Sequence, residues 1–223
     1  MQASSNDRWH SAWLLPLAIA VVSGLLAWAC ALDPRWHDVL DYRRAAVAAG
    51  EAWRLITAHL MHLSIEHAVL DVAGLGLVAW IFAAELGWRL QALVSVVAIV
   101  FIDTALWVLR IDRYVGLSGV LHAWFAMGAV GWLLAARDDA LRPQGRDAAL
   151  RRRLWGAVLS IGLCAKLVLE SHHQAFWHDG TAFPVVTSAH RWGALAGVVC
   201  GLGAAAFRRR AGTIDAGRVS RAR

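Results

Sequence analysis

Long apolar runs separated by short polar segments follow one another along most of the chain. Six runs are candidates for membrane-crossing helices, and they lie at about residues 13–32, 54–83, 89–109, 118–136, 154–170 and 188–207. A helix of about 20 residues crosses the roughly 30 Å hydrocarbon core of a bilayer. The pattern therefore predicts an all-α membrane protein with six transmembrane helices. The membrane domain is expected at 13–207, with a short N-terminal segment at 1–12 and a polar tail at 208–223.

The composition agrees with a membrane class. Hydrophobic residues make up 59% of the 223 residues and charged residues only 17%, which is too apolar for one soluble domain. The first run is longer than the core of a secretory signal, so we interpret it as a retained span. The cysteines all fall within predicted spans and are interpreted as packing residues rather than disulfide partners.

Positive charge is concentrated at the ends of the predicted spans. Six arginines lie in 137–153 and six in 208–223, whereas 171–187 contains no Lys or Arg. The positive-inside rule then predicts that both termini and 137–153 are cytoplasmic and that 171–187 is outside. This placement of the arginines on the cytoplasmic side accounts for the net charge of +6, so a nucleic-acid partner is not needed to explain it. We expect 208–223 to be a disordered basic tail on the cytoplasmic leaflet. The connection 33–53, with its tryptophans, tyrosine and charges, is expected to be an interfacial loop outside.

Ionisable and hydroxyl side chains inside spans are candidate functional residues, because they are costly in lipid. They are His59, His62, His67 and Asp71 in the second run, Asp103 in the third, Ser118 and His122 in the fourth, Lys166 and Glu170 in the fifth, and His190 in the sixth. Ser118 and His190 each lie in the first turn of a span that runs from outside to inside. They are therefore expected at the same level, near the outer face.

Two stripes of small residues predict that the fourth and sixth spans pack closely. They consist of Gly119, Ala123 and Ala126 after Ser118, and of Gly193, Gly197 and Gly201 after His190. Small residues let two helices approach each other closely. If the stripes meet, Ser118 and His190 come within side-chain reach, which is the pairing that activates a serine nucleophile.

Each candidate also has a purely structural interpretation. Ser118 can be a helix cap, His190 an interfacial histidine, and His67 and Asp71 structural groups. Lys166 and Glu170 are one turn apart, and we favour an ion pair between them over substrate recognition.

A zinc site is an alternative interpretation of the histidines in the second run. His59 and His62 have the spacing of metal ligands on a helix, with His67 as a third. Neither an H-E-x-x-H motif nor a cysteine pair is present, so we expect no metal and no cofactor.

The motif around Ser118 is G-x-S-G, formed by Gly116, Leu117, Ser118 and Gly119. Together with E-A-W-R-L-I-T at 51–57, His67 followed by Asp71, and the glycine stripe after His190, it resembles rhomboid intramembrane proteases over nearly the whole chain. Within that superfamily the chain looks most like the rhombosortase branch. The strings that carry this likeness are Y-V-G-L-S-G-V-L-H at 114–122, A-K-L-V-L-E at 165–170 and F-P-V-V-T-S-A-H at 183–190.

The resemblance implies a compact six-helix rhomboid-like bundle in the bacterial inner membrane, with a water-filled site that opens outward. It implies a Ser–His dyad without a third carboxylate, in which Ser118 is the nucleophile and His190 the base. The resemblance assigns His67 to the oxyanion, with backbone N–H groups of the helix start flanked by Gly116 and Gly119. The implied substrate is a membrane-anchored secreted protein with a C-terminal Gly-Gly motif, an apolar span and a basic end.

Asp71 departs from the family pattern, which has Asn at this position. An ionised carboxylate cannot donate a hydrogen bond to an oxyanion. Asp71 therefore orients His67, keeps it cationic, or is itself protonated. The departure also leaves open a catalytically inactive rhomboid-like protein that binds transmembrane clients. A transporter or channel is a further alternative, but neither a repeat nor a broken helix pair supports it.

Overall fold

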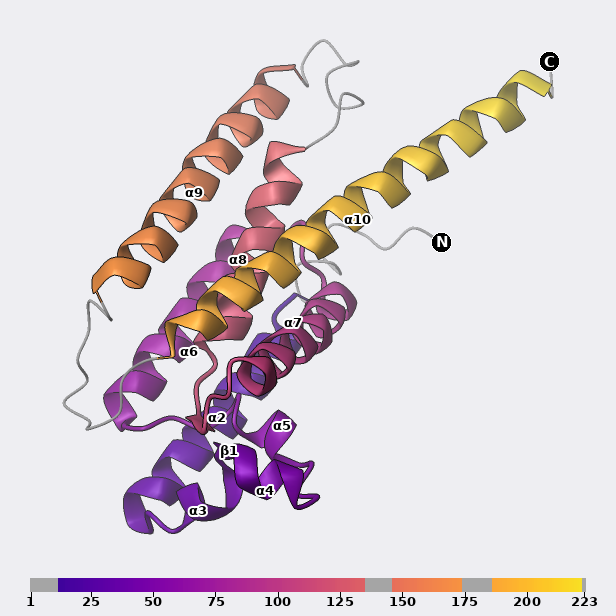
Figure 1. Cartoon of the computed structure of the whole chain (residues 1–223). Coiled ribbons are helices and arrows are strands. Elements are labelled where there is room, and N and C mark those ends of the chain that lie inside the picture. The colour runs from indigo at the N-terminus through magenta and orange to yellow at the C-terminus, as the bar shows by residue number, and fades with distance from the viewer. Residues whose placement is uncertain (1–11, 135–145, 174–185, 222–223) are drawn as a thin grey trace.

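The computed structural model describes residues 12–134, 146–173 and 186–221, and these residues are mostly helical (Figure 1). The elements are α2 (Leu14–Leu32), α3 (Trp36–Leu40), β1 (Tyr42–Arg43), α4 (Arg44–Ala48), α5 (Arg54–Thr57), α6 (Ile65–Ile81), α7 (Trp88–Val108), β2 (Arg113–Tyr114), α8 (Ser118–Leu133), α9 (Arg146–His173) and α10 (Thr187–Arg221). The all-α prediction is confirmed for the described residues. The predicted segment 1–12, except for its last residue, and most of the two loops that set the predicted topology lie outside them.

Three of the described helices, α2, α7 and α9, are long and apolar enough to cross a membrane. Their outward faces carry large apolar side chains that are more than half exposed, such as Leu25, Val100 and Ile161. Such faces are unfavourable in water but are matched by lipid tails. The structure therefore supports a membrane protein, with these three helices as candidate spans. The other three spans of the six remain a prediction.

The predicted second span is interrupted. The apolar run 54–83 contains the four-residue helix α5, a non-helical segment, and then α6, which begins at Ile65. Ser64 caps α6, because its Oγ accepts a hydrogen bond from the backbone N–H of His67 at 3.2 Å. His59 and His62 therefore lie between two helices and not on a helix face, and the helical metal-ligand spacing considered for them is wrong.

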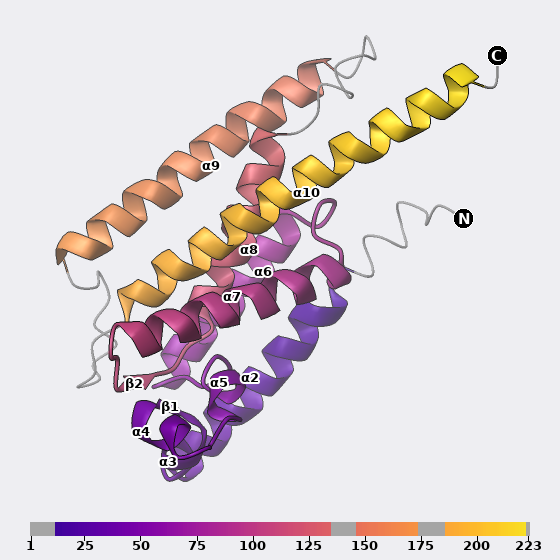
Figure 2. The same ribbon diagram turned by 45° about the vertical axis from the view of Figure 1, so that its right-hand side comes forward.

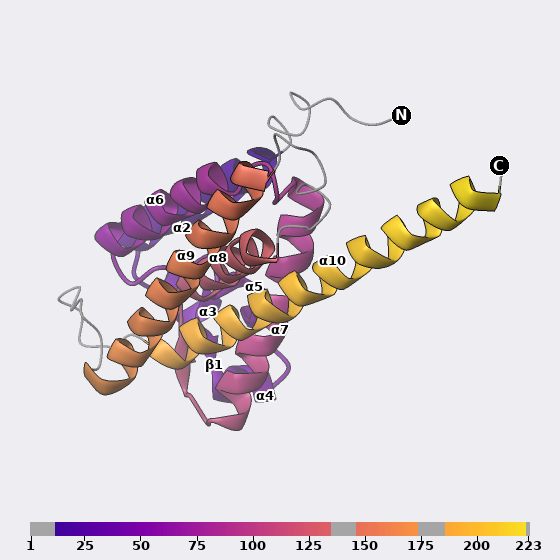
Figure 3. The same ribbon diagram turned by 90° about the horizontal axis from the view of Figure 1, so that it is seen from above.

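The C-terminal tail also differs from the prediction. α10 continues as one helix to Arg221, so 208–221 is not a disordered segment. No proline interrupts this stretch, and arginine, which is favourable in helices, supplies five of its 14 residues. The end of α10 projects away from the other helices (Figure 1 and Figure 3).

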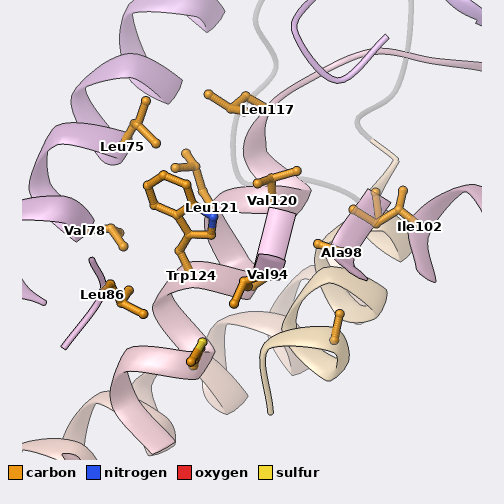
Figure 4. Close-up of a cluster of buried hydrophobic side chains, with 14 of the residues drawn as sticks. Leu75, Val78, Leu86, Val94, Ala98, Ile102, Leu117, Val120, Leu121 and Trp124 are labelled. Atoms are coloured by element: carbon orange, nitrogen blue, oxygen red, sulfur yellow. The ribbon is translucent and has the colours of Figure 1, made fainter. Parts of the chain in front are cut away.

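α8 is the central helix of the bundle (Figure 2). It packs most extensively against α10 and also contacts α9, α7 and α6. The core around it includes Leu75 and Val78 of α6, Ile102 of α7, and Trp124 of α8 (Figure 4). Trp124 is fully buried, and its indole N–H donates to Ser95 Oγ at 2.9 Å. This packing holds α8 in place relative to the helices around it.

A short antiparallel strand pair ties the first connection to the segment before α8. Tyr42 pairs with Tyr114, and Arg43 pairs with Arg113. Arg113 also forms an ion pair with Asp41 at 2.6 Å. Tyr42 is completely buried, so it is a core residue and not the interfacial residue that the sequence suggested.

The rest of the first connection is organised by a buried arginine. Arg54 donates to the carbonyl oxygens of Asp38 and Asp41, both at 2.8 Å. Trp36 and Trp53 are about half exposed on the surface of this connection. The prediction of an interfacial surface is compatible with these two tryptophans, while the interior of the connection is ordered by hydrogen bonds.

Candidate active site

The close packing of α8 on α10 brings two first turns together. A Cβ added at Gly193 would lie 2.0 Å from the carbonyl oxygen of Gly119, and one added at Gly197 would lie 2.1 Å from that of Ala123. No side chain larger than hydrogen fits at either glycine without a shift of the backbone. The two small-residue stripes thus meet as the sequence predicted.

Ser118 and His190 form a direct hydrogen bond at this contact. Ser118 is the first residue of α8, and His190 lies in the first turn of α10. Ser118 Oγ is 2.8 Å from His190 Nε2, and His190 is only 5% exposed. The arrangement is that of a serine whose proton an adjacent imidazole can accept.

Glu170 of α9 reaches the other ring nitrogen of His190. Its Oε2 is 2.9 Å from His190 Nδ1. An ionised carboxylate only accepts hydrogen bonds, so Nδ1 carries the ring proton and Nε2 accepts the hydroxyl proton of Ser118. The expected dyad without a carboxylate therefore does not describe this geometry. From the sequence, only Lys166 is expected as a partner of Glu170, because no local sequence feature indicates that α9 and α10 bring Glu170 to His190.

His122 and Lys166 complete the surroundings of His190. The His122 ring stacks on the His190 ring, with centroids 4.3 Å apart and an interplanar angle of 10°. His122 Nδ1 donates to the Ser118 carbonyl oxygen at 2.6 Å, and Lys166 Nζ donates to His122 Nε2 at 2.9 Å. Lys166 also donates to Glu170 Oε1, so the predicted ion pair is present. Ser118 and Glu170 thus contact the two nitrogens of the His190 ring, and the His122 ring covers one of its faces.

The residues just before Ser118 are held by three hydrogen bonds. Gly116 has φ of 128°, a left-handed conformation that glycine adopts without strain. Its N–H donates to the Ala58 carbonyl at 3.0 Å, and its carbonyl accepts from Tyr114 Oη at 2.6 Å. Burial raises the pKa of Tyr114, so its hydroxyl retains the proton that it donates. The Leu117 N–H donates to Asp71 Oδ2 at 3.1 Å.

The Asp71 carboxylate lies close to several polar groups. Its Oδ2 lies 3.1 Å from His62 Nε2 and 3.6 Å from His67 Nε2, in addition to the Leu117 N–H. Of the roles left open by the sequence, orientation of neighbouring groups fits this geometry. The sequence indicated His67 as a partner of Asp71. His62 and the segment before Ser118 are partners that the sequence did not indicate.

His67 lies beside Gly116 and Ser118. A Cβ added at Gly116 would be 3.4 Å from His67 Cε1 and 3.7 Å from Ser118 Oγ. The first N–H groups of a helix have no carbonyl partner within that helix, and α8 starts at Ser118. A side-chain donor and helix N-terminal donors thus meet next to the hydroxyl, as an oxyanion requires.

A cavity of about 330 Å³ opens next to these groups. Ser118, His67 and His190 line it together with apolar residues such as Leu63 and Val186. A larger groove of about 400 Å³ between α2 and α6 has no ionisable lining residue. The smaller cavity is therefore the candidate place for a reacting substrate.

One group of side chains in the described residues also has ligand atoms close enough for a metal ion. Atoms of His122, Glu170 and His190 lie within 4.8 Å of one another. Lys166 already donates to two of these residues, so its ammonium supplies the positive charge at this position. The histidines considered as zinc ligands are instead paired with carboxylates, His59 with Asp103 at 3.2 Å and His62 with Asp71.

No protein-family model matches the chain, and no curated protein matches it. The functional conclusion therefore depends on the residues and their geometry.

Proposed function

We propose that this chain is an intramembrane serine endopeptidase in which Ser118 is the nucleophile and His190 the general base. The observation that carries the proposal is the partly buried hydrogen bond of 2.8 Å between Ser118 Oγ and His190 Nε2. It lies beside a cavity and among groups that can donate to a developing oxyanion. A serine hydroxyl that merely caps a helix has no need of an oriented imidazole.

The chemistry is acyl transfer. Ser118 Oγ attacks the scissile carbonyl carbon while its proton passes to His190 Nε2. His67 and the N–H groups at the start of α8 stabilise the oxyanion. The tetrahedral intermediate collapses as His190 returns the proton to the leaving amine. Water then attacks the acyl carbon and passes a proton to His190 Nε2, and His190 returns that proton to Ser118 Oγ as the ester bond breaks and the acid product leaves.

The substrate that we propose is a membrane-anchored protein that ends in a Gly-Gly motif, an apolar span and a basic end. The apolar outer faces of α2, α7 and α9, along which a transmembrane segment can approach, support the apolar span of this substrate, and its Gly-Gly motif and basic end come from the resemblance to rhombosortases. We further propose six spans, both termini in the cytoplasm and a site at the outer face of a bacterial inner membrane, as in rhombosortases. The arginine-poor 171–187 segment and the arginine-rich 137–153 segment support this orientation.

The test is cleavage of such a substrate in liposomes that contain the purified protein. We expect Ser118→Ala and His190→Ala each to reduce cleavage to a small residual rate, and the double variant to be no slower than either single one. Ser171→Ala is the matched control, because its exposed hydroxyl lies on α9 and donates only to the Val168 carbonyl. A fluorophosphonate probe should label wild type and not Ser118→Ala.

Two results would reject this function. Cleavage by Ser118→Ala at the wild-type rate removes the serine mechanism. A wild-type protein that neither cleaves nor reacts with the probe, yet still binds transmembrane clients, is instead an inactive rhomboid-like protein.

A further inference from the structure

The two oxygens of the Glu170 carboxylate have different partners. Oε1 accepts from Lys166, and Oε2 lies 2.9 Å from His190 Nδ1. The side chain of Glu170 is 11% exposed. A structural ion pair within α9 accounts for the contact with Lys166 but not for the bond to a residue on another helix. The contact of the second oxygen therefore indicates a function of Glu170 at His190.

We propose that Glu170 and Lys166 are positioning residues of the active site, Glu170 for His190 and Lys166 for both Glu170 and His122. This inference rests on the proposed function. Glu170 keeps the proton of His190 on Nδ1, so that Nε2 is free to accept the proton of Ser118. When Nε2 takes that proton, His190 becomes a cation with two N–H donors, and the carboxylate stabilises it without taking the proton itself.

Lys166 balances the charge of Glu170 and orients His122. A lone carboxylate at the level of a membrane helix is costly, and the adjacent ammonium compensates its charge. The same ammonium donates to His122 Nε2, which leaves the ring proton of His122 on Nδ1, directed at the Ser118 carbonyl. One lysine thereby orients both the carboxylate behind His190 and the ring stacked on it.

The experiment measures kcat and KM for Glu170→Gln, which removes the negative charge and keeps the size of the side chain. We expect kcat to fall by about 100-fold or more, because the wrong tautomer of the base becomes available. KM should stay unchanged, since no substrate contact is lost. Labelling of Ser118 by the fluorophosphonate probe should slow by a similar factor. Ser171→Ala, the adjacent position on α9, serves as the control at wild-type rate.

Lys166 variants test the second half of the inference. Lys166→Met keeps the length of the side chain without its charge and is expected to lower kcat by roughly 10-fold, typical for loss of an outer partner. Lys166→Arg restores a cation and should recover part of the rate. In the Glu170→Gln background, Lys166→Met should have a smaller effect than in the wild type. Equal kcat in Lys166→Met and wild type overturns the role of Lys166.

A double-mutant comparison separates positioning of His190 from a general structural effect. Glu170→Gln added to His190→Ala should lower the residual rate no further, because the carboxylate acts through the imidazole. A further loss there, or a wild-type kcat in Glu170→Gln, overturns the inference. If Glu170→Gln does not accumulate in the membrane, Glu170→Asp takes its place. It withdraws the carboxylate by one methylene, and a wild-type kcat in that variant equally overturns the inference.

The proposed function can survive this outcome. Inactive Ser118→Ala and His190→Ala beside a fully active Glu170→Gln would leave a dyad enzyme, with Glu170 and Lys166 as an ion pair only. Cleavage by Ser118→Ala at the wild-type rate would instead reject the proposed function itself.

Discussion

The substitution Gly193→Ala adds a single methyl group and tests whether the close packing of α8 on α10 brings Ser118 and His190, the proposed catalytic pair, together. A Cβ at this position would lie 2.0 Å from the Gly119 carbonyl oxygen, whereas carbon and oxygen rarely approach closer than about 3.3 Å. The obstacle is helix backbone, which cannot rotate away as a side chain can. In Gly193→Ala, α8 and α10 therefore have to separate by roughly 1.3 Å at this level.

That separation acts directly on the proposed chemistry. Gly119 follows Ser118, and Gly193 is one turn after His190, so the shift is passed to both reacting side chains. It stretches the 2.8 Å bond between Oγ and Nε2 beyond hydrogen-bonding distance. A misplacement of about 1 Å lowers rates by roughly 100-fold. We expect a loss of that order in kcat/KM, and destabilisation of about 1–3 kcal/mol from overpacking.

Other glycines on α10 provide a graded control. Gly203→Ala meets nothing within 4 Å and should leave cleavage and thermal stability unchanged. Gly201→Ala meets the Val130 side chain at 2.9 Å, which can adjust, so its effect should be intermediate. Liposome cleavage, probe labelling and unfolding in detergent measure the series. If Gly193→Ala cleaves like wild type while remaining stable, the close packing of α8 on α10 does not determine the distance between Ser118 and His190 that the proposed mechanism needs.

Three further outcomes are expected. Asp71→Ala leaves the Leu117 N–H without its acceptor, so it should lower stability by about 1–3 kcal/mol and strongly reduce turnover. Asp71→Asn keeps an acceptor oxygen and should reduce turnover less; a faster Asp71→Asn enzyme contradicts the orienting role. Arg54→Met removes the buried donor of the first connection and should lower the free energy of unfolding in detergent by roughly 3 kcal/mol, whereas an unchanged value contradicts its structural role. Alkaline phosphatase fused after residue 178 should be active and fused after residue 145 inactive, and the reverse result rejects the proposed orientation.

Much of the helical framework and the central pair of residues were predictable from the sequence. Apolar runs of membrane length indicate helices because lipid leaves no other partner for the backbone polar groups. Helical periodicity places Gly193 and Gly197 on the face that follows His190, which predicts a close approach to another small-residue face. Since Ser118 and His190 both lie in the first turn of such helices, the sequence predicts their contact on the condition that the two small-residue stripes meet.

Other features depended on the tertiary structure. Hydropathy does not distinguish a continuous span from one interrupted by a buried connection, so the break between α5 and α6 was missed. The Leu117 N–H found its acceptor in Asp71, 46 positions away in the chain. The side chain of Glu170 reaches His190 only because α9 and α10 bring it within hydrogen-bonding distance. Periodicity specifies which face of a helix is apolar or small, but the partner of a polar side chain is decided by the distance and angle between helices.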